Sequence, residues 1–492
     1  MTTVRIADGR PEIAAVLAEP EPRVTRPYVW RLAAVPFAFG AGFRVLLVLY
    51  VQVLHGNFLF LDDQGYDRIG WSLAQDWHMN QFPAPVSVAV TSSYFYYVFV
   101  AAVYFVFGRH WVLVKVIAAL LSALSVPAAA AVGDSLGGRR LAMAAAWLTA
   151  LYPNAIFWGT TGLKDGPLAT LMLVMAAIAL RPLTLRRLAA AVVLLAVAFL
   201  SRPVEGVVGL AMLVVPAIEL VRGRWPGRVR PVGAGSRLLV LLVGLPVLSW
   251  MSISLASHYL PVLKASLAGQ ATLSLGTGPV AIKFFPSPFD LVHALLCPVR
   301  WFGPAAAAAY GPLVPGMVVW TVMLPAFALG CWELLRRGPW AARGIVVSAF
   351  AYVYMYTCVF QSQGFTRQRF TVEILLLVVG LHAFERFPQR ATVWTAIGAC
   401  VIAPAALVEA RVLPPLGFAL VLIALGALLF AEESGTLARV RRATRKRGAT
   451  NTSSSGSGQP DQRAALIWGT VPRRAEAPGA QEQDRGCRHP AR

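Results

Sequence analysis

The sequence predicts an all-α polytopic membrane protein, with about 12 transmembrane helices and further juxtamembrane helices on the outer face of the membrane. Hydrophobic residues make up 57% of the chain and charged residues only 14%. A soluble domain is about half apolar and about a quarter charged. Apolar runs of about 20 residues, long enough to cross a bilayer, recur along the chain. Composition and run length therefore agree on the fold class.

The apolar runs and the charges between them define the expected spans. We predict spans at residues 31–53, 111–133, 140–157, 166–181, 187–200, 203–221, 236–255, 316–335, 341–361, 370–386, 391–409 and 414–432. In domain terms, we expect a cytoplasmic segment at 1–27, a transmembrane domain at 28–432 and a disordered basic cytoplasmic tail at 433–492. The longest outer loops are expected at 56–110 and 256–313.

Arginine is distributed unevenly between alternate connections. The arginine-rich set includes the connection at 222–237, whereas the other set holds few basic residues. Cytoplasmic loops carry the excess of basic residues, so we place both termini in the cytoplasm of a plasma (inner) membrane. This assignment is consistent with the basic connections only if residues 93–107, a short apolar run rich in tyrosine, stay on the outer face and do not cross the membrane. The same distribution accounts for the net charge of +21 without a nucleic-acid partner.

Three aspartates stand close together after the first span, in the stretch Leu61–Asp67. We expect Asp62 and Asp63 in an outer loop. There they would act as a general base or hold a hard divalent cation through oxygen. The alternative is that they are solvated, or that they cap an amphipathic surface helix expected at Tyr66–Trp77. Asp67 is expected on the solvated face of that helix.

A second outer loop carries Lys164 and Asp165, just before Pro167, a residue that suits a helix start. Asp165 could face the acidic pair while Lys164 binds a phosphate. The alternative is that Asp165 caps the next helix and Lys164 extends to the membrane interface.

Three arginines on the outer side, Arg202, Arg367 and Arg369, are candidate phosphate ligands. Guanidinium groups form bidentate hydrogen bonds to phosphate oxygens. The alternative is that these side chains contact bulk lipid headgroups. The sequence has no nucleotide-binding loop, so a nucleotide-driven mechanism has no support. It also lacks a zinc-protease motif.

These features together resemble the GT-C superfamily of integral-membrane glycosyltransferases. The features are the acidic pair after the first span, the amphipathic helix beyond it, the Lys164-Asp165 loop and the Arg-x-Arg before a late span. Within the superfamily, the chain resembles the bacterial members grouped with protein O-mannosyltransferases and the lipid A aminoarabinose transferase. The resemblance covers roughly 30–430. A Lys-Pro-Pro motif after the amphipathic helix and the long C-terminal domain of some relatives are absent from the sequence.

The resemblance implies transfer of a sugar from a polyprenyl-phosphate donor to a glycan, lipid or protein acceptor on the outer face. It implies catalytic roles for Asp62, Asp63 and Asp165, and phosphate neutralisation by Arg202, Arg367 and Arg369. Lys164 is a further phosphate ligand in this hypothesis. A divalent cation, Mg²⁺ or Mn²⁺, held by Asp62 and Asp165 could share in the neutralisation.

Two other functions fit a many-span protein. An O-antigen-type polysaccharide polymerase or ligase would also use outer-face arginines, but it would not need the acidic pair. A flippase or transporter of lipid-linked sugars predicts internal repeats and broken helices around a site at the bilayer midplane.

Overall fold

The computed structural model describes residues 26–56, 61–81, 93–222, 295, 313–360 and 365–402. All of them belong to one compact unit of the chain, residues 1–428. Secondary structure in these residues is entirely helical, so the expected all-α class is confirmed. The spans predicted at 236–255 and 414–432 lie outside the described residues, as do the tail at 433–492 and almost all of the loop at 256–313.

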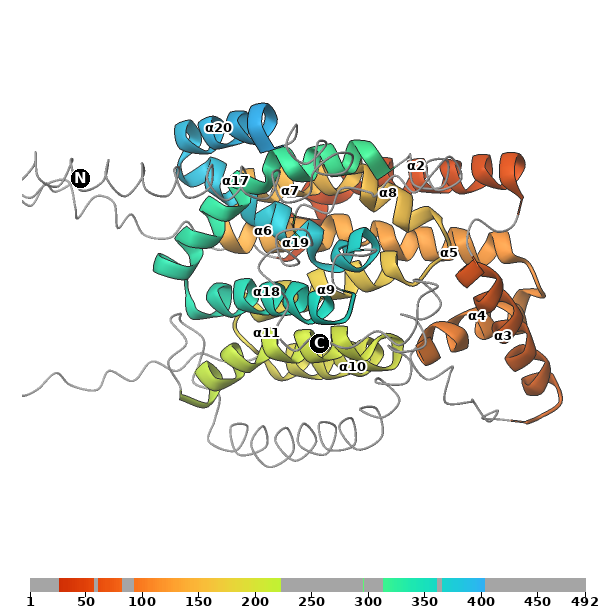
Figure 1. The fold of residues 1–492 in the computed structure, drawn as a ribbon. Helices are drawn as coiled ribbons and strands as arrows, with labels where there is room; N and C mark the ends of the chain where they lie inside the picture. The colour runs from red at the N-terminus through yellow and green to blue at the C-terminus, as the bar shows by residue number, and fades with distance from the viewer. Residues whose placement is uncertain are drawn as a thin grey trace, which may run out of the picture. The chain divides into compact units, whose positions relative to one another are not determined.

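The described helices follow the apolar runs of the sequence (Figure 1). They are α2 (Arg26–His55), α3 (Leu61–His78), α4 (Tyr94–Phe107), α5 (Trp111–Ala123), α6 (Ser125–Gly137), α7 (Arg139–Leu151), α8 (Pro153–Thr160), α9 (Asp165–Ala179), α10 (Leu185–Ser201), α11 (Pro203–Arg222), α17 (Val314–Arg337), α18 (Trp340–Phe360), α19 (Phe365–Arg386) and α20 (Pro388–Ile397). A short π-helix, Gly398–Ile402, follows α20. The first described helix begins at Arg26, and almost all of the N-terminal segment expected at 1–27 lies outside the described residues.

Three of these helical stretches are long and apolar enough to cross a membrane: Tyr28–Leu54, Trp111–Gly137 and Val314–Arg337. The second stretch combines α5 and α6. A fourth crossing results if α7 and α8, which are bent by 53° relative to each other, form one broken span. The described residues thus support a membrane protein with several transmembrane helices, and the larger number of spans stays a prediction.

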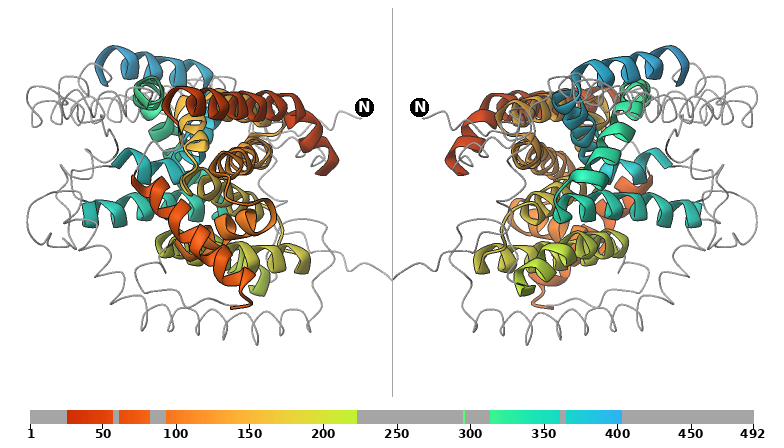
Figure 2. Two further views of the ribbon diagram at one scale, coloured as in Figure 1. Left: turned by 90° about the vertical axis from the view of Figure 1, so that its right-hand side faces the viewer. Right: turned by 90° about the vertical axis from the view of Figure 1, so that its left-hand side faces the viewer.

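Packing brings together helices that are distant in sequence. α10 and α11 lie side by side in all three views, and α11 packs on α18 (Figures 1 and 2). α19 packs against both α17 and α9, and α3 packs on α4. The main hydrophobic core is formed by buried side chains from most of these helices, including Trp158, Met172, Trp320 and Leu377. This core holds the starts of α9 and α11 close enough for their charged residues to share a partner.

The break between α7 and α8 occurs at Pro153, and Arg44 supplies a hydrogen bond in place of the one that the proline removes. Pro153 has no N–H, so the carbonyl of Thr149 loses its normal partner four residues later. The guanidinium of Arg44, on α2, donates to the carbonyl oxygens of Thr149 at 3.2 Å and Ala155 at 3.3 Å. The span predicted at 140–157 is therefore divided between α7 and α8, because the proline interrupts the backbone hydrogen bonds.

Candidate functional site

A cluster of buried charged side chains lies where α9 begins and where α10 is followed by α11. Arg202, between α10 and α11, donates to Asp165 Oδ1 at 2.7 Å and to Glu205 Oε1 at 2.8 Å. Both carboxylates are fully buried. The arginine therefore joins the first turn of α9 to the first turn of α11.

Neighbouring polar side chains extend this cluster. Tyr352, on α18, donates its hydroxyl to Glu205 Oε1 at 3.0 Å. Lys164 Nζ donates to the hydroxyl of Ser93 and to the carbonyl oxygen of Ser201, the latter at 3.1 Å. We define the Arg202 network as the set Lys164, Asp165, Arg202, Glu205 and Tyr352. The structure thus brings together three of the residues that the sequence singled out.

The acidic pair lies in the first turn of α3. The loop expected at Leu61–Asp67 is helical, because α3 begins at Leu61 and not at Tyr66. Carboxylates in a first helical turn are favoured by the exposed backbone N–H groups and the helix dipole. Asp62 is exposed and Asp63 is fully buried. Successive residues of a helix point about 100° apart, which is why two adjacent aspartates have different surroundings.

Two tyrosines of α4, Tyr96 and Tyr97, lie close enough to these acids for the carboxylates to raise their pKa values. Burial, followed by the nearby Tyr66, Asp63 and Asp165, raises the pKa of Tyr96 well above its ordinary value. Burial and the carboxylate of Asp62 raise the pKa of Tyr97 to about 12. Asp63 and Asp165 therefore both lie within electrostatic reach of the same phenol. Asp62 lies near the next residue of α4.

Asp67 does not lie on a solvated face, which corrects the sequence-based expectation. Only 4% of it is exposed. Its carboxylate accepts hydrogen bonds from the hydroxyl of Tyr104 and from Arg109, with an ion-pair distance of 2.5 Å to the guanidinium Nη2. Asp67 thus fastens α3 to the end of α4. The face of α3 that packs on α4 is wider than the hydrophobic pattern alone indicated.

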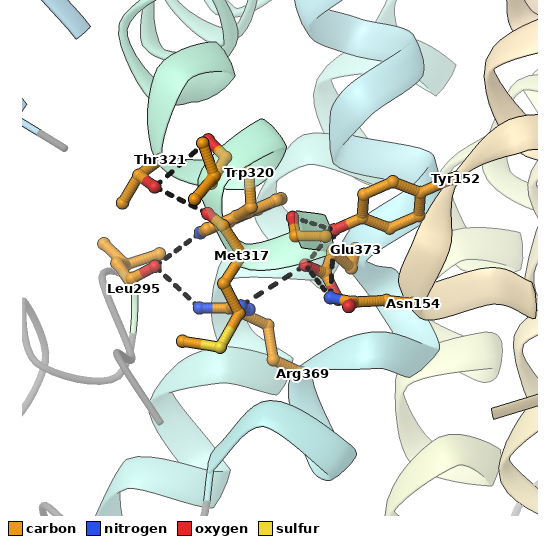
Figure 3. A network of polar contacts seen from close by, with 10 residues as sticks. Tyr152, Asn154, Leu295, Met317, Trp320, Thr321, Arg369 and Glu373 are labelled. Carbon is orange, nitrogen blue, oxygen red and sulfur yellow. Dashed lines mark hydrogen bonds and ion pairs between the residues drawn. The ribbon is translucent and has the colours of Figure 1, made fainter. Parts of the chain in front are cut away.

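A second polar cluster surrounds Arg369 and Glu373, one turn apart on α19 (Figure 3). Arg369 Nη2 lies 3.3 Å from Glu373 Oε1, and both side chains are fully buried. The guanidinium stacks on the Trp320 ring, with its central carbon 4.6 Å from the ring centroid. Its Nη1 and the Trp320 indole N–H both donate to the carbonyl oxygen of Leu295, at 2.9 Å and 2.6 Å.

The other side of Glu373 is held by residues at the bend between α7 and α8. Tyr152 donates its hydroxyl to Glu373 Oε1, and Asn154 Nδ2 donates to the same oxygen at 3.2 Å. Figure 3 shows these side chains pointing toward one another from α8, α17 and α19 and from the link before α8. We define the Arg369 network as the set Tyr152, Asn154, Trp320, Arg369 and Glu373.

The candidate phosphate ligands do not all meet at one point. Arg202 and Lys164 belong to the Arg202 network, whereas Arg369 belongs to the Arg369 network. Arg367 lies in the first turn of α19, and its side chain is outside what the structure describes. Arg202 and Arg369 each contact carboxylates within the protein. A phosphate at either arginine would have to compete with these acids.

The acids of the described residues do not form a preformed metal site. Within the described ranges, no group of three or more histidine, cysteine, aspartate or glutamate residues lies close enough to hold an ion. Asp165, one of the two expected ligands, already pairs with Arg202 through Oδ1. Because a hard divalent cation prefers several oxygen ligands, the described acids by themselves do not fit it.

Four buried charged residues were missed by the sequence reasoning: Arg44, Lys115, Glu205 and Glu373. The sequence does mark them, because each is an ionisable residue within an apolar run. Burying a charge there costs free energy, so such residues normally have a role. Glu205 and Glu373 also follow Arg202 and Arg369 at helical spacing, three and four residues later. Spacing to a known arginine could have identified both glutamates.

Comparisons with protein-family models, with curated proteins and with solved structures find no match to this chain.

Proposed function

We propose that this protein is a membrane glycosyltransferase of the GT-C type. It transfers a sugar from a polyprenyl-phosphate donor to a glycan, lipid or protein acceptor on the outer face of the plasma membrane. Both termini lie in the cytoplasm. The observation that carries the proposal is that Tyr96 of α4 links the two acidic segments. Its ring packs on Tyr66 of α3, and its hydroxyl donates to Gly162, in the loop before Asp165.

The arrangement supports a division of labour between the two adjacent acids. A general base must reach the proton that it removes. Asp62 is exposed and Asp63 is buried, so Asp62 is the base in this proposal and Asp63 belongs to the charged surroundings. Asp165 and Arg202 form the buried part of the same site.

The proposed reaction is a direct displacement at the anomeric carbon. Asp62 takes the proton of an acceptor hydroxyl, and the acceptor oxygen forms a bond to the anomeric carbon. The bond from that carbon to the phosphate oxygen breaks, and the polyprenyl phosphate leaves with the bonding electrons. Basic side chains beside the acids stabilise the negative charge on the leaving phosphate. The acidic and basic groups must flank one reacting centre, which fits their clustering.

The test is transfer of labelled sugar in proteoliposomes. Purified protein is reconstituted with a panel of radiolabelled polyprenyl-phosphate sugars and cell-envelope acceptors. Label transfer is then compared among the wild type, Asp62→Asn and Asp165→Asn. We expect each substitution to lower the rate by about 100-fold or more, the range for loss of a catalytic acid or base. Asp76→Asn, near the other end of α3, is the matched control and should retain transfer.

Transfer that survives both substitutions would overturn the proposal. Asp62→Asn changes an exposed side chain and should not disturb folding. Thermal unfolding of Asp165→Asn identifies any loss that comes from a damaged Arg202 network.

A flippase of lipid-linked sugars is the second candidate, and one observation favours it. α7 and α8 form a broken helix, and the buried Arg369 network lies beside the break. Broken helices next to buried polar groups are typical of transporters. Movement of a labelled lipid-linked sugar across the bilayer, with no new glycosidic bond, would favour this function over transfer.

A further inference from the structure

Lys115 is a buried cation that the proposed chemistry has not used. It lies on α5, one turn after Trp111, and only 1% of the residue is exposed. None of the described residues accepts a hydrogen bond from its Nζ. Asp63 is the carboxylate close enough to act on it electrostatically. An ammonium group has three N–H donors, and burying it without an acceptor is costly.

The chain makes room for this side chain at Gly162, in the loop before α9. A Cβ added at Gly162 would lie 2.8 Å from Lys115 Cγ and 3.2 Å from the Trp111 ring. Gly162 also has a φ of +74°, which disfavours any side chain. The hydroxyl of Tyr96 fixes the loop by donating to the carbonyl oxygen of Gly162 at 2.5 Å. Lys115 therefore lies against the loop that carries Lys164 and Asp165.

The position of Lys115 along its helix suits a lipid phosphate. It lies four residues from the start of the Trp111–Gly137 stretch, about 6 Å along the helix axis. Lipid phosphates lie at the boundary of the hydrocarbon core, near the ends of membrane-crossing helices. Long basic side chains near such ends reach the headgroup level.

We propose that Lys115 binds the phosphate group of the donor, together with Lys164. This inference rests on the proposed function and assigns its phosphate subsite to the contact between α5 and the loop before α9. Arg202 and Arg369 are bound to carboxylates of the protein. In the described structure, Lys115 Nζ donates to no protein acceptor, so its N–H groups are available for a phosphate. The phosphate oxygens supply the acceptors that this buried ammonium requires.

The experiment measures binding of three probes to the full-length protein in phosphatidylcholine nanodiscs. The probes are farnesyl phosphate, farnesol and inorganic phosphate. They separate the lipid tail from the phosphate group. We expect the wild type to prefer farnesyl phosphate over farnesol. Lys115→Met should weaken farnesyl phosphate binding by about tenfold or more, since a hydrogen bond to a charged group contributes at least that much to affinity.

Two further variants control for charge and for folding. Lys115→Arg retains the cation and should keep much of the binding. Arg186→Met removes one positive charge from an exposed position on α10 and should bind like the wild type. Lys115→Met should leave the thermal unfolding midpoint unchanged or higher, because it removes a buried ammonium. A merely structural lysine would instead lower the midpoint and leave probe preference unaltered.

The outcomes separate this inference from the proposed function. Equal binding of farnesyl phosphate by the wild type and Lys115→Met overturns the subsite and leaves the proposed function standing. Binding of inorganic phosphate that depends on Lys115, without binding of farnesyl phosphate, supports the anion site and overturns the polyprenyl donor. A wild type that binds none of the phosphate probes overturns both.

Discussion

The Arg202 network and the Arg369 network are both built around a buried arginine, yet they are organised differently. Arg202 pairs with two carboxylates, Asp165 and Glu205, from the starts of two helices. Arg369 pairs with one described carboxylate, Glu373, on its own helix. That glutamate also receives neutral hydrogen bonds from Tyr152 and Asn154.

The difference indicates which cluster is suited to chemistry. In the Arg369 network, neutral donors and an aromatic ring surround one ion pair, an arrangement suited to holding α17, α19 and the broken span together. In the Arg202 network, charged side chains from the start of α9, the link between α10 and α11 and the start of α11 meet. A substrate could exchange contacts with such a cluster. One substitution in each network, and a third at the exposed Arg109–Asp67 pair, test this comparison through the free energy of unfolding.

Arg202→Met should have the largest effect. It leaves two buried carboxylates without their shared cation, and breaking a buried ion pair from one side costs about 3–5 kcal/mol. The free energy of unfolding, measured by dodecyl sulfate titration in mixed micelles, should fall by that amount. A loss below about 1 kcal/mol, the value for an exposed pair, would show that the network is solvated.

Arg369→Met should cost less, about 2–3 kcal/mol, because a hydrogen bond to a charged group is lost while Glu373 keeps its neutral donors. The same titration measures the change, and the two methionine variants are matched in side-chain chemistry. A cost equal to that of Arg202→Met would contradict the contrast between the two networks.

Arg109→Gln should have the smallest effect, about 1 kcal/mol, as expected for a partly exposed ion pair. The Arg109 side chain is 48% exposed, and its partner Asp67 keeps the hydroxyl of Tyr104. Unfolding monitored by tryptophan fluorescence would detect the change. Substitution of Tyr104 by Phe provides the comparison, because it removes the buried partner instead of the exposed one.

Much of the fold could be predicted because hydrophobic pattern is a local property. The helices α10, α11, α17 and α18 begin and end within a few residues of their predicted spans. The start of α3 was missed because the acidic pair was taken for a loop, although acids are favoured in a first helical turn. The bend before Pro153 was missed because apolar periodicity continues across it.

The candidate site was predictable in its residue types and less so in its partners. Lys164, Asp165 and Arg202 were selected as isolated charges between apolar runs, and the structure joins them. Their counter-charge Glu205 was not selected. Arg369 was assigned to the same phosphate, yet it contacts Glu373 in another network.

The sequence by itself determined the all-helical class, the apolar runs and the small set of charges that must be satisfied among them. These follow from composition and from periodicity along the chain. Tertiary structure decided how each charge is satisfied. Asp165 and Arg202 are 37 residues apart, and Arg44 and Ala155 are 111 residues apart. It also made Asp62 exposed and its neighbour Asp63 buried. Packing between distant helices sets these outcomes, and no local pattern encodes which helices will meet.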